Sequence, residues 1–151
     1  MGRLERLSLQ LEQFPKIGLD TVIFIYAFER HPDFGPLAQT VFQTVEKKTC
    51  QACASVLALG EVLVGVKRAG DYDLQLRYQS AFQYFPNLAL CDADFRVMDI
   101  MSDLRLKYNL HTPDAIHLAT ALSQQAQAFI TNDLRLKKVT ELEIVVLTEF
   151  M

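Results

Sequence analysis

The sequence is poor in several residue types and lacks the segments that mark specialised classes of protein. Its 151 residues include no tryptophan and only three cysteines. Cys50 and Cys53 have the CxxC spacing, but no second pair and no His tract completes a zinc site. Both lie in a β-like run, so we expect inert core thiols in a reducing cytoplasm. No apolar run is long and uncharged enough to span a membrane, and we expect no secretory leader.

Positive charge is not in excess either. The chain has 15 Lys and Arg against 18 Asp and Glu, which gives a formal net charge of −3. This net charge neither indicates nor excludes binding to nucleic acid, because basic side chains can gather locally beside a carboxylate site. A serine–histidine–acid set and a Gly-rich phosphate loop are also missing, so neither acyl transfer nor P-loop nucleotide hydrolysis is supported.

Hydrophobic residues make up 50% of the chain, which is ample for a core, and the length suits one domain. We expect an N-terminal extension over residues 1–15, with a short helix at 4–14, and a single domain over residues 16–151. Strands are predicted at 17–19, 50–54, 88–91, 128–133 and 143–147, and helices at 21–28, 37–48, 55–70, 71–85, 92–108, 112–122 and 134–139. This alternation predicts an α/β fold, a three-layer sandwich whose mainly parallel central sheet is flanked by helices.

One predicted helix presents an acid at its N-terminus. Thr112 is suited to the N-cap, Pro113 to the first helical position and Asp114 to the second. The residues behind them form an apolar stripe at helical spacing, namely Ala115, Leu118, Ala119 and Leu122. Alone, Asp114 is explained by the helix dipole, which an acid there stabilises by about 0.3–1 kcal/mol. A functional role requires other acids beside it.

Three further acids fall where a ligand site is expected. Asp20 and Asp133 follow predicted strands, and ligands of open α/β sheets bind beyond the C-terminal ends of the strands. Glu61 interrupts an otherwise apolar helix, next to Gly60, which leaves room for close approach. Taken singly, each acid is better explained by turn formation, helix capping or solvent exposure. Taken jointly with Asp114, they predict one carboxylate cluster.

Other notable residues receive more ordinary interpretations. We expect His117 to pack or to hydrogen-bond at the flank of this cluster rather than to act as a general base. Four aromatic residues have core spacing: Phe82, Tyr84, Phe85 and Phe95. We expect them to pack in the core rather than to form a platform for stacked bases.

Four segments together resemble the PIN-domain nucleases, and the small VapC-type ribonuclease toxins of prokaryotes are similar in size. The segments are Leu19-Asp20-Thr21, Leu59-Gly-Glu61-Val-Leu, Thr112-Pro-Asp114-Ala-Ile-His-Leu-Ala-Thr-Ala121 and Phe129-Ile-Thr-Asn-Asp133, and the resemblance covers residues 16–147. It implies a PIN-like fold and an endoribonuclease that hydrolyses RNA phosphodiester bonds, as the toxin of a toxin–antitoxin pair. An inhibitory antitoxin partner and a homodimer are implied as well.

By this resemblance Asp20, Glu61, Asp114 and Asp133 are the catalytic, metal-binding acids, with Thr131 as a polar neighbour on the substrate side. Two carboxylates about 4 Å apart repel by roughly 4 kcal/mol at an effective dielectric of 20, so either some stay protonated or a divalent cation neutralises them. Oxygen ligands without a His–Cys set select Mg²⁺ or Mn²⁺. Such a site, with one ion or two, can activate water for phosphodiester hydrolysis.

Five basic residues are near enough in sequence to hold phosphates, namely Arg105, Lys107, Arg135, Lys137 and Lys138. Solvated helix ends explain each of them equally well, and Arg135 is the candidate substrate contact. Some PIN-domain nucleases carry a further acid after the last one, where this chain has Leu134-Arg135-Leu136. This departure predicts one tightly held ion, with a second recruited only by substrate. The extension before residue 16 is not part of the usual pattern.

Two other functions compete with the nuclease. A non-catalytic PIN-like module that binds RNA or protein would tolerate neutral residues at the four acidic positions, all of which hold acids here. A phospho-accepting receiver-like domain would need a lysine near a strand end opposite paired acids, and the order of residues here is wrong for it. The nuclease is therefore the leading hypothesis.

Overall fold

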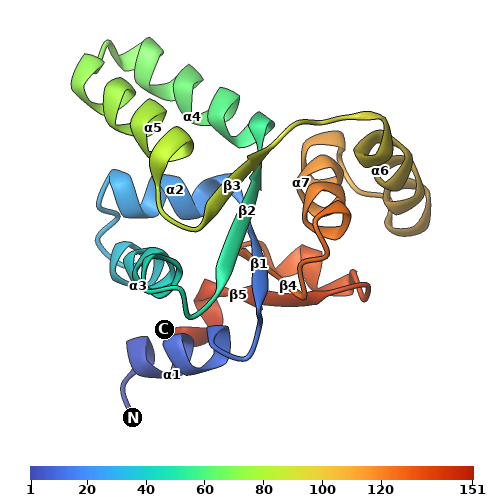
Figure 1. Cartoon of the computed structure of the whole chain (residues 1–151), viewed down its shortest axis with the longest axis horizontal. Helices are drawn as coiled ribbons and strands as arrows, with labels where there is room; N and C mark the ends of the chain where they lie inside the picture. The colour runs from blue at the N-terminus through green and yellow to red at the C-terminus, as the bar shows by residue number, and fades with distance from the viewer.

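A five-stranded sheet, parallel throughout, forms the centre of the computed structural model, which describes residues 1–151 (Figure 1). The strands are β1 (Lys16–Leu19), β2 (Gln51–Ser55), β3 (Leu88–Cys91), β4 (Ala128–Thr131) and β5 (Glu143–Val146), in the order β3-β2-β1-β4-β5. The predicted α/β sandwich is thus confirmed. The chain runs outward from β1 to β3 and then returns to β4, so the strand order reverses between β1 and β4, where such sheets bind ligands.

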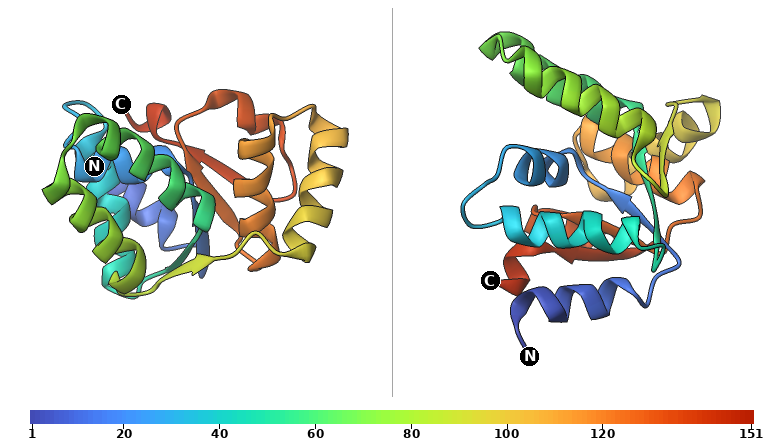
Figure 2. Two further views of the ribbon diagram at one scale, coloured as in Figure 1. Left: turned by 90° about the horizontal axis from the view of Figure 1, so that it is seen from above. Right: turned by 60° about the vertical axis from the view of Figure 1, so that its left-hand side comes forward.

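Helices cover both faces of the sheet. One face carries α1 (Arg3–Leu11), α2 (Thr21–Phe28), α3 (Gly35–Glu46), α4 (Val56–Ala69), α5 (Tyr72–Tyr84) and the 3₁₀ turn η2 (Leu147–Phe150); the other carries α6 (Phe95–Tyr108), α7 (Thr112–Ser123) and the 3₁₀ turn η1 (Leu134–Lys138). The helices α4 and α5 form a hairpin that projects beyond the sheet (Figure 2). None of the helices combines the length and apolar character needed to cross a membrane.

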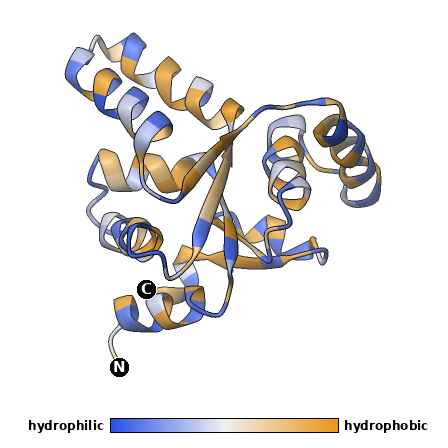
Figure 3. Cartoon of the chain, viewed as in Figure 1, coloured by the Kyte–Doolittle hydropathy of each residue, from blue (hydrophilic) through white to orange (hydrophobic).

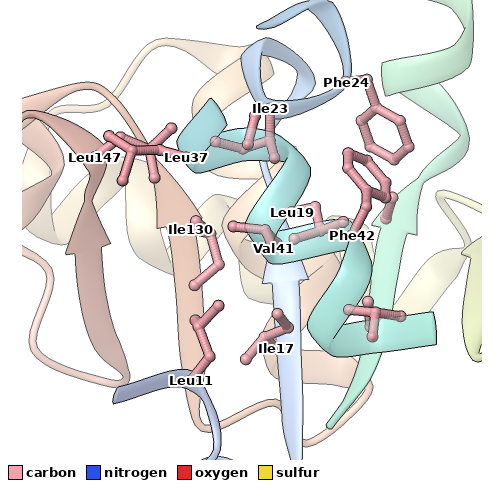
Figure 4. Close-up of a cluster of buried hydrophobic side chains, with 14 of the residues drawn as sticks. Leu11, Ile17, Leu19, Ile23, Phe24, Leu37, Val41, Phe42, Ile130 and Leu147 are labelled. Atoms are coloured by element: carbon pink, nitrogen blue, oxygen red, sulfur yellow. The ribbon is translucent and has the colours of Figure 1, made fainter. Parts of the chain in front are cut away.

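Each face of the sheet has its own hydrophobic core, because strands buried on both sides alternate their side chains between the two. In the larger core, Ile17 and Leu19 of β1 gather with side chains of α1, α2 and α3 (Figure 4). Phe24 of α2 stacks on Phe82 of α5 with 4.2 Å between ring centroids. The smaller core lies under α6 and α7 and includes Phe129 of β4. Colouring by hydropathy shows the helices striped, with polar residues on their outer sides (Figure 3).

The first fifteen residues contribute to the larger core. Leu7 and Leu11 of α1 are fully buried in the same cluster that contains Phe150 of η2. The guanidinium of Arg6 lies 5.7 Å from the centroid of the Phe150 ring. The two ends of the chain are therefore side by side, as Figures 1 and 2 show.

The helix that carries Asp114 begins one residue earlier than predicted. His111 has an extended backbone and is the N-cap, without a capping side-chain hydrogen bond, so the prediction of Thr112 as the cap was wrong. Pro113 therefore occupies the second helical position, where its missing N–H costs nothing because the first N–H groups of a helix lack intrahelical partners. Asp114 is the third helical residue and remains in the first turn, close to the positive end of the helix dipole.

The expectation of core packing holds for only two of the four aromatic residues. Phe82 is buried and Phe85 packs against the larger core. Tyr84 is 77% exposed and Phe95 is 90% exposed, so the prediction was wrong for both. Tyr84 is the last residue of α5 and Phe95 is the first of α6. Each lies two residues from a buried side chain of its own helix, Phe82 or Val97, and therefore points to the opposite side of that helix.

A glycine in β1 allows α7 to pack directly on the sheet. A Cβ atom at Gly18 would lie 2.6 Å from the Cβ of Ala121 and 3.0 Å from Cδ1 of Phe129. Because the first of these neighbours cannot rotate away, a side chain at this position must push α7 off the strand.

Gly18→Ala is expected to lower the free energy of unfolding by about 1–3 kcal/mol, the usual cost of overpacking a core. Gly65→Ala is the matched control, because Gly65 lies in α4 with no atom within 4 Å of the new Cβ. This control should raise stability by up to about 1 kcal/mol, since alanine favours helix. Urea unfolding followed by circular dichroism measures both. A Gly18→Ala protein as stable as the wild type would contradict the close contact.

Candidate active site

Two of the candidate acids lie where the strand order reverses. Asp20 directly follows β1, and its backbone N–H donates to the carbonyl of Ile130 in β4 at 3.0 Å. Asp133 follows β4 and caps η1 with its side chain. Because parallel strands end at the same edge of a sheet, both aspartates lie at its C-terminal edge.

Both carboxylate oxygens of Asp20 accept hydrogen bonds. Oδ1 accepts from the backbone N–H of Thr21 at 2.8 Å, which caps α2, and Oδ2 accepts from Oγ1 of Thr131 at 2.7 Å. Burial nevertheless raises the pKa of Asp20 above its ordinary value, and its interactions with His117 and the two threonines offset this only in part. The nearby Asp114 adds to the rise.

Glu61 is held through only one of its oxygens. Oε1 accepts from Oγ1 of Thr21 at 2.7 Å and lies 2.7 Å from Nε2 of His117. The hydrogen bond from His117 is the main reason that the pKa of Glu61 falls below its ordinary value, against the opposing effect of burial. Oε2 has no hydrogen-bond partner. Thr21 therefore joins two acids, because its N–H contacts Asp20 and its hydroxyl contacts Glu61.

The other two acids have opposite electrostatic environments. Arg135 binds Asp133 in a bidentate manner, with Nε 3.0 Å from Oδ1 and an Nη atom 2.7 Å from Oδ2, and lowers the pKa of Asp133. Asp114 is partly buried and has no hydrogen-bond partner, and its pKa is raised by burial and by Asp133. Both acids line a pocket of about 80 Å³ together with His111, Arg135 and Lys138.

One continuous series of hydrogen bonds connects three of the acids. The N–H of Asp133 donates to Oγ1 of Thr131 at 3.2 Å, and Thr131 in turn donates to Asp20. Thr21 continues the series from Asp20 to Glu61. The fourth acid is linked by charge, because it raises the pKa of Asp20 and its own pKa is raised by Asp133. These four residues, Asp20, Glu61, Asp114 and Asp133, are called the acidic cluster below.

The chemistry of the acidic cluster fits a divalent cation, although its present arrangement is not a closed metal site. No three His, Cys, Asp or Glu side chains lie close enough together to hold a metal ion. The donors are all carboxylate oxygens, the ligands that Mg²⁺ and Mn²⁺ prefer. Asp20 and Asp114 have raised pKa values, which a neighbouring cation would lower. Asp133 can join them only if Arg135 releases it.

Sequence reasoning missed the residues that hold the acids in place. Thr21 contacts both Asp20 and Glu61, and Asn132 fixes the turn between β4 and η1. The amide nitrogen of Asn132 donates to the hydroxyl of Tyr26 at 3.1 Å, and its oxygen accepts from N and Oγ1 of Thr148 at 2.9 and 2.6 Å. Both residues adjoin an acid in the sequence, which was the only signal available. The expectation that His117 hydrogen-bonds beside the cluster is confirmed.

Most of the candidate phosphate-binding residues have partners outside the acidic cluster, namely Arg105, Lys107 and Lys137. Arg135 and Lys138 are the two that line the pocket beside the acids. Both are exposed, so their charges face solvent at the mouth of the site.

The cysteines lie away from this chemistry. Cys50 and Cys53 are buried and free. Burial raises the pKa of Cys50 to about 11 and that of Cys53 to about 12, so neither forms a thiolate near neutral pH. The prediction of inert core thiols is confirmed.

Comparisons with known proteins show which family model and which solved structures this chain is similar to. The model of the PIN domain family matches residues 17–142. A solved VapBC2 complex from Rickettsia felis, bound to a promoter DNA fragment, contains a chain with a TM-score of 0.69 and 19% identity, over 85% of this chain and 96% of that one. A chain of a toxin–antitoxin complex from Klebsiella pneumoniae has a TM-score of 0.66 and 25% identity, over 87% of this chain and 97% of that one. A chain of a DNA-bound VapBC from Salmonella typhimurium has a TM-score of 0.64 and 18% identity, over 87% of this chain and 98% of that one. No curated protein matches the chain.

Asp114→Asn is expected to raise the free energy of unfolding of the metal-free protein near neutral pH. Since burial and Asp133 raise the pKa of Asp114 in the folded state, ionisation costs stability as pH rises from the unfolded pKa through the folded one. The gain should vanish at about pH 3, below the ordinary pKa, where Asp114 is protonated in both states. Denaturant unfolding in EDTA at both pH values measures it, and a variant no more stable than the wild type near neutral pH would refute it.

Proposed function

Since the chain belongs to the PIN domain family, we propose that it is a Mg²⁺- or Mn²⁺-dependent endoribonuclease that hydrolyses RNA phosphodiester bonds. The observation that carries the proposal is the series of hydrogen bonds that joins Asp20, Glu61 and Asp133, with Asp114 beside it, at the reversal of the strand order. That edge is where an α/β sheet presents residues to a ligand.

The four residues of the acidic cluster would hold the cation. When bound, a divalent cation there supplies an activated water and stabilises the leaving oxygen of an in-line phosphodiester displacement. Asp20 and Asp114 supply negative charge that the protein compensates only in part. Asp114 also lies in the first turn of α7, where the helix dipole favours its ionised form.

Arg135 and Lys138 are the side chains that would hold the RNA backbone. The guanidinium of Arg135 matches a phosphate as well as it matches the carboxylate it now binds. An exchange of Arg135 from Asp133 to a phosphate would release Asp133 for the cation and bring substrate to the same place. Thr131, which donates to Asp20 at 2.7 Å, would keep that carboxylate oriented during this exchange.

A toxin of a toxin–antitoxin pair is the biological role that we propose for this nuclease. The matched structures are a toxin–antitoxin complex and two VapBC complexes, which supports an inhibitory antitoxin partner for this chain too. A homodimer and a cytoplasmic location belong to the same proposal, and the three free cysteines fit a reducing compartment. A small open reading frame directly beside this one separates the toxin from an RNA-processing nuclease, for which no such neighbour is required.

One observation favours the alternative of a non-catalytic module that binds RNA or protein. Arg135 already neutralises Asp133, and the side chains form no closed metal site. A binding module would have no use for a cation. Asp20 and Asp114, however, keep raised pKa values at a cost in stability that a binding module could avoid with asparagine, so the nuclease is the better supported function.

Asp20→Asn and Asp114→Asn should each reduce Mg²⁺- or Mn²⁺-dependent RNA cleavage at least about 100-fold, since even changes to residues that only hydrogen-bond a metal ligand cost about 10- to 100-fold. Asp73→Asn is the matched control, because Asp73 is an exposed acid of α5 outside the cluster, and it should cleave like the wild type. Cleavage of a labelled single-stranded RNA with and without EDTA measures the effect. Cleavage that survives chelation, or equal rates for all variants, would exclude the metal-dependent nuclease.

Arg135→Ala should change metal and RNA binding in opposite directions. Removal of the guanidinium frees Asp133, so Mn²⁺ should bind more tightly, while RNA should bind more weakly because a phosphate contact is lost. Lys137→Ala is the control, because Lys137 pairs with Glu149 and should change neither. Calorimetry with Mn²⁺ and filter binding with RNA in EDTA give the two affinities. A loss of both would show instead that Arg135 only supports the local fold.

A further inference from the structure

His117 is a buried polar residue that the proposed chemistry leaves without a role. It lies in α7 and is only 4% exposed. Its Nε2 is 2.7 Å from Oε1 of Glu61 and 3.2 Å from Oγ1 of Thr21. Its other ring nitrogen, Nδ1, is buried and has no hydrogen-bond partner. One side of the ring is thus fully used and the other is left unsatisfied.

The contacts determine where the proton on this ring lies. A carboxylate oxygen only accepts hydrogen bonds, so Nε2 of His117, 2.7 Å from Oε1 of Glu61, carries the hydrogen and donates it. The hydroxyl of Thr21 gives its single hydrogen to the same oxygen. Oε1 of Glu61 therefore receives two donors, from α2 and from α7, while Oε2 receives none.

Packing alone does not explain a histidine at this position. The neighbouring positions of α7 are apolar and buried, and they include Ala115, Leu118 and Ala119. A leucine would fill such a site without burying an acceptor that has no donor, which is unfavourable. The unsatisfied Nδ1 is retained because the same ring, through Nε2, contacts Glu61.

We propose that His117 is a positioning residue for Glu61, which with Thr21 fixes Oε1 and leaves Oε2 free to bind the cation. This inference rests on the proposed metal-dependent function. His117 and Asp114 are three residues apart and therefore lie on the same side of α7. One rigid helix then sets two members of the acidic cluster, Asp114 directly and Glu61 through the imidazole. The contact also links the α4–α5 hairpin to the opposite face of the sheet.

The test compares three substitutions that separate reach from packing. His117→Leu fills the space without a donor. His117→Gln carries an amide N–H at nearly the distance of Nε2 from the backbone, and His117→Asn carries the same amide too close to the backbone to reach Glu61. The Mn²⁺ dissociation constant of each full-length protein is measured by electron paramagnetic resonance, with thermal unfolding in EDTA alongside.

We expect His117→Leu and His117→Asn to weaken Mn²⁺ binding by about 10- to 100-fold, as the loss of a residue that hydrogen-bonds a metal ligand usually does. His117→Gln should stay within a few-fold of the wild type. His117→Leu should unfold at a temperature close to that of the wild type, since removal of the unsatisfied nitrogen offsets the loss of the hydrogen bond to Glu61. A purely structural role would give the reverse pattern, with unchanged Mn²⁺ affinity in every folded variant or a loss that glutamine does not restore.

The two proposals fail in different ways. If the wild type itself binds no Mn²⁺, the metal-dependent function is excluded and this inference falls with it. If the wild type binds Mn²⁺ and Asp114→Asn does not, while all three His117 variants bind as tightly as the wild type, only the role of His117 is overturned.

Discussion

The cost of holding four carboxylates near one another and partly out of water is the constraint around which this edge of the sheet is arranged. Each member of the acidic cluster meets it differently. Asp20 accepts from two threonines, Glu61 is bound by a threonine and a buried histidine, and Asp133 is paired with a guanidinium. Asp114 has only the end of a helix to favour its charge. Because globular proteins are only marginally stable, two acids with raised pKa values take up a substantial part of the free energy of folding.

The residues that satisfy these acids also build the local fold. Thr21 begins α2 and Thr131 ends β4, so the two donors that orient Asp20, the N–H of Thr21 and the hydroxyl of Thr131, lie on two elements beside the reversal of strand order. Asp20 itself caps α2, and Asp133 caps η1. The site is therefore held by hydrogen bonds on the side of the sheet, whereas the pairing of Arg135 with Asp133 is exposed to solvent.

Local signals in the sequence were enough to predict the elements but not the contacts between them. Ser55 caps α4 and Gly70 ends it with a left-handed φ of 69°, as their residue types indicate. The acids were found because they follow strands or interrupt apolar helices. The contact between Glu61 and His117 joins residues 56 positions apart, and nothing local reports such a pairing. The exposure of Phe95, by contrast, follows from helical spacing, because Phe95 lies two residues from the buried Val97 and points to the opposite side of α6.

The packing of α1 against η2 bears on how the molecule is made. Leu7 and Leu11 are translated long before Leu147 and Phe150, with which they share a core. During synthesis the apolar side of α1 therefore stays exposed until η2 has been made, and chaperones or proteases can bind it in that interval. The same closeness of the ends makes the chain a natural candidate for circular permutation, because a short linker can join them without disturbing the edge of the sheet that carries the acids.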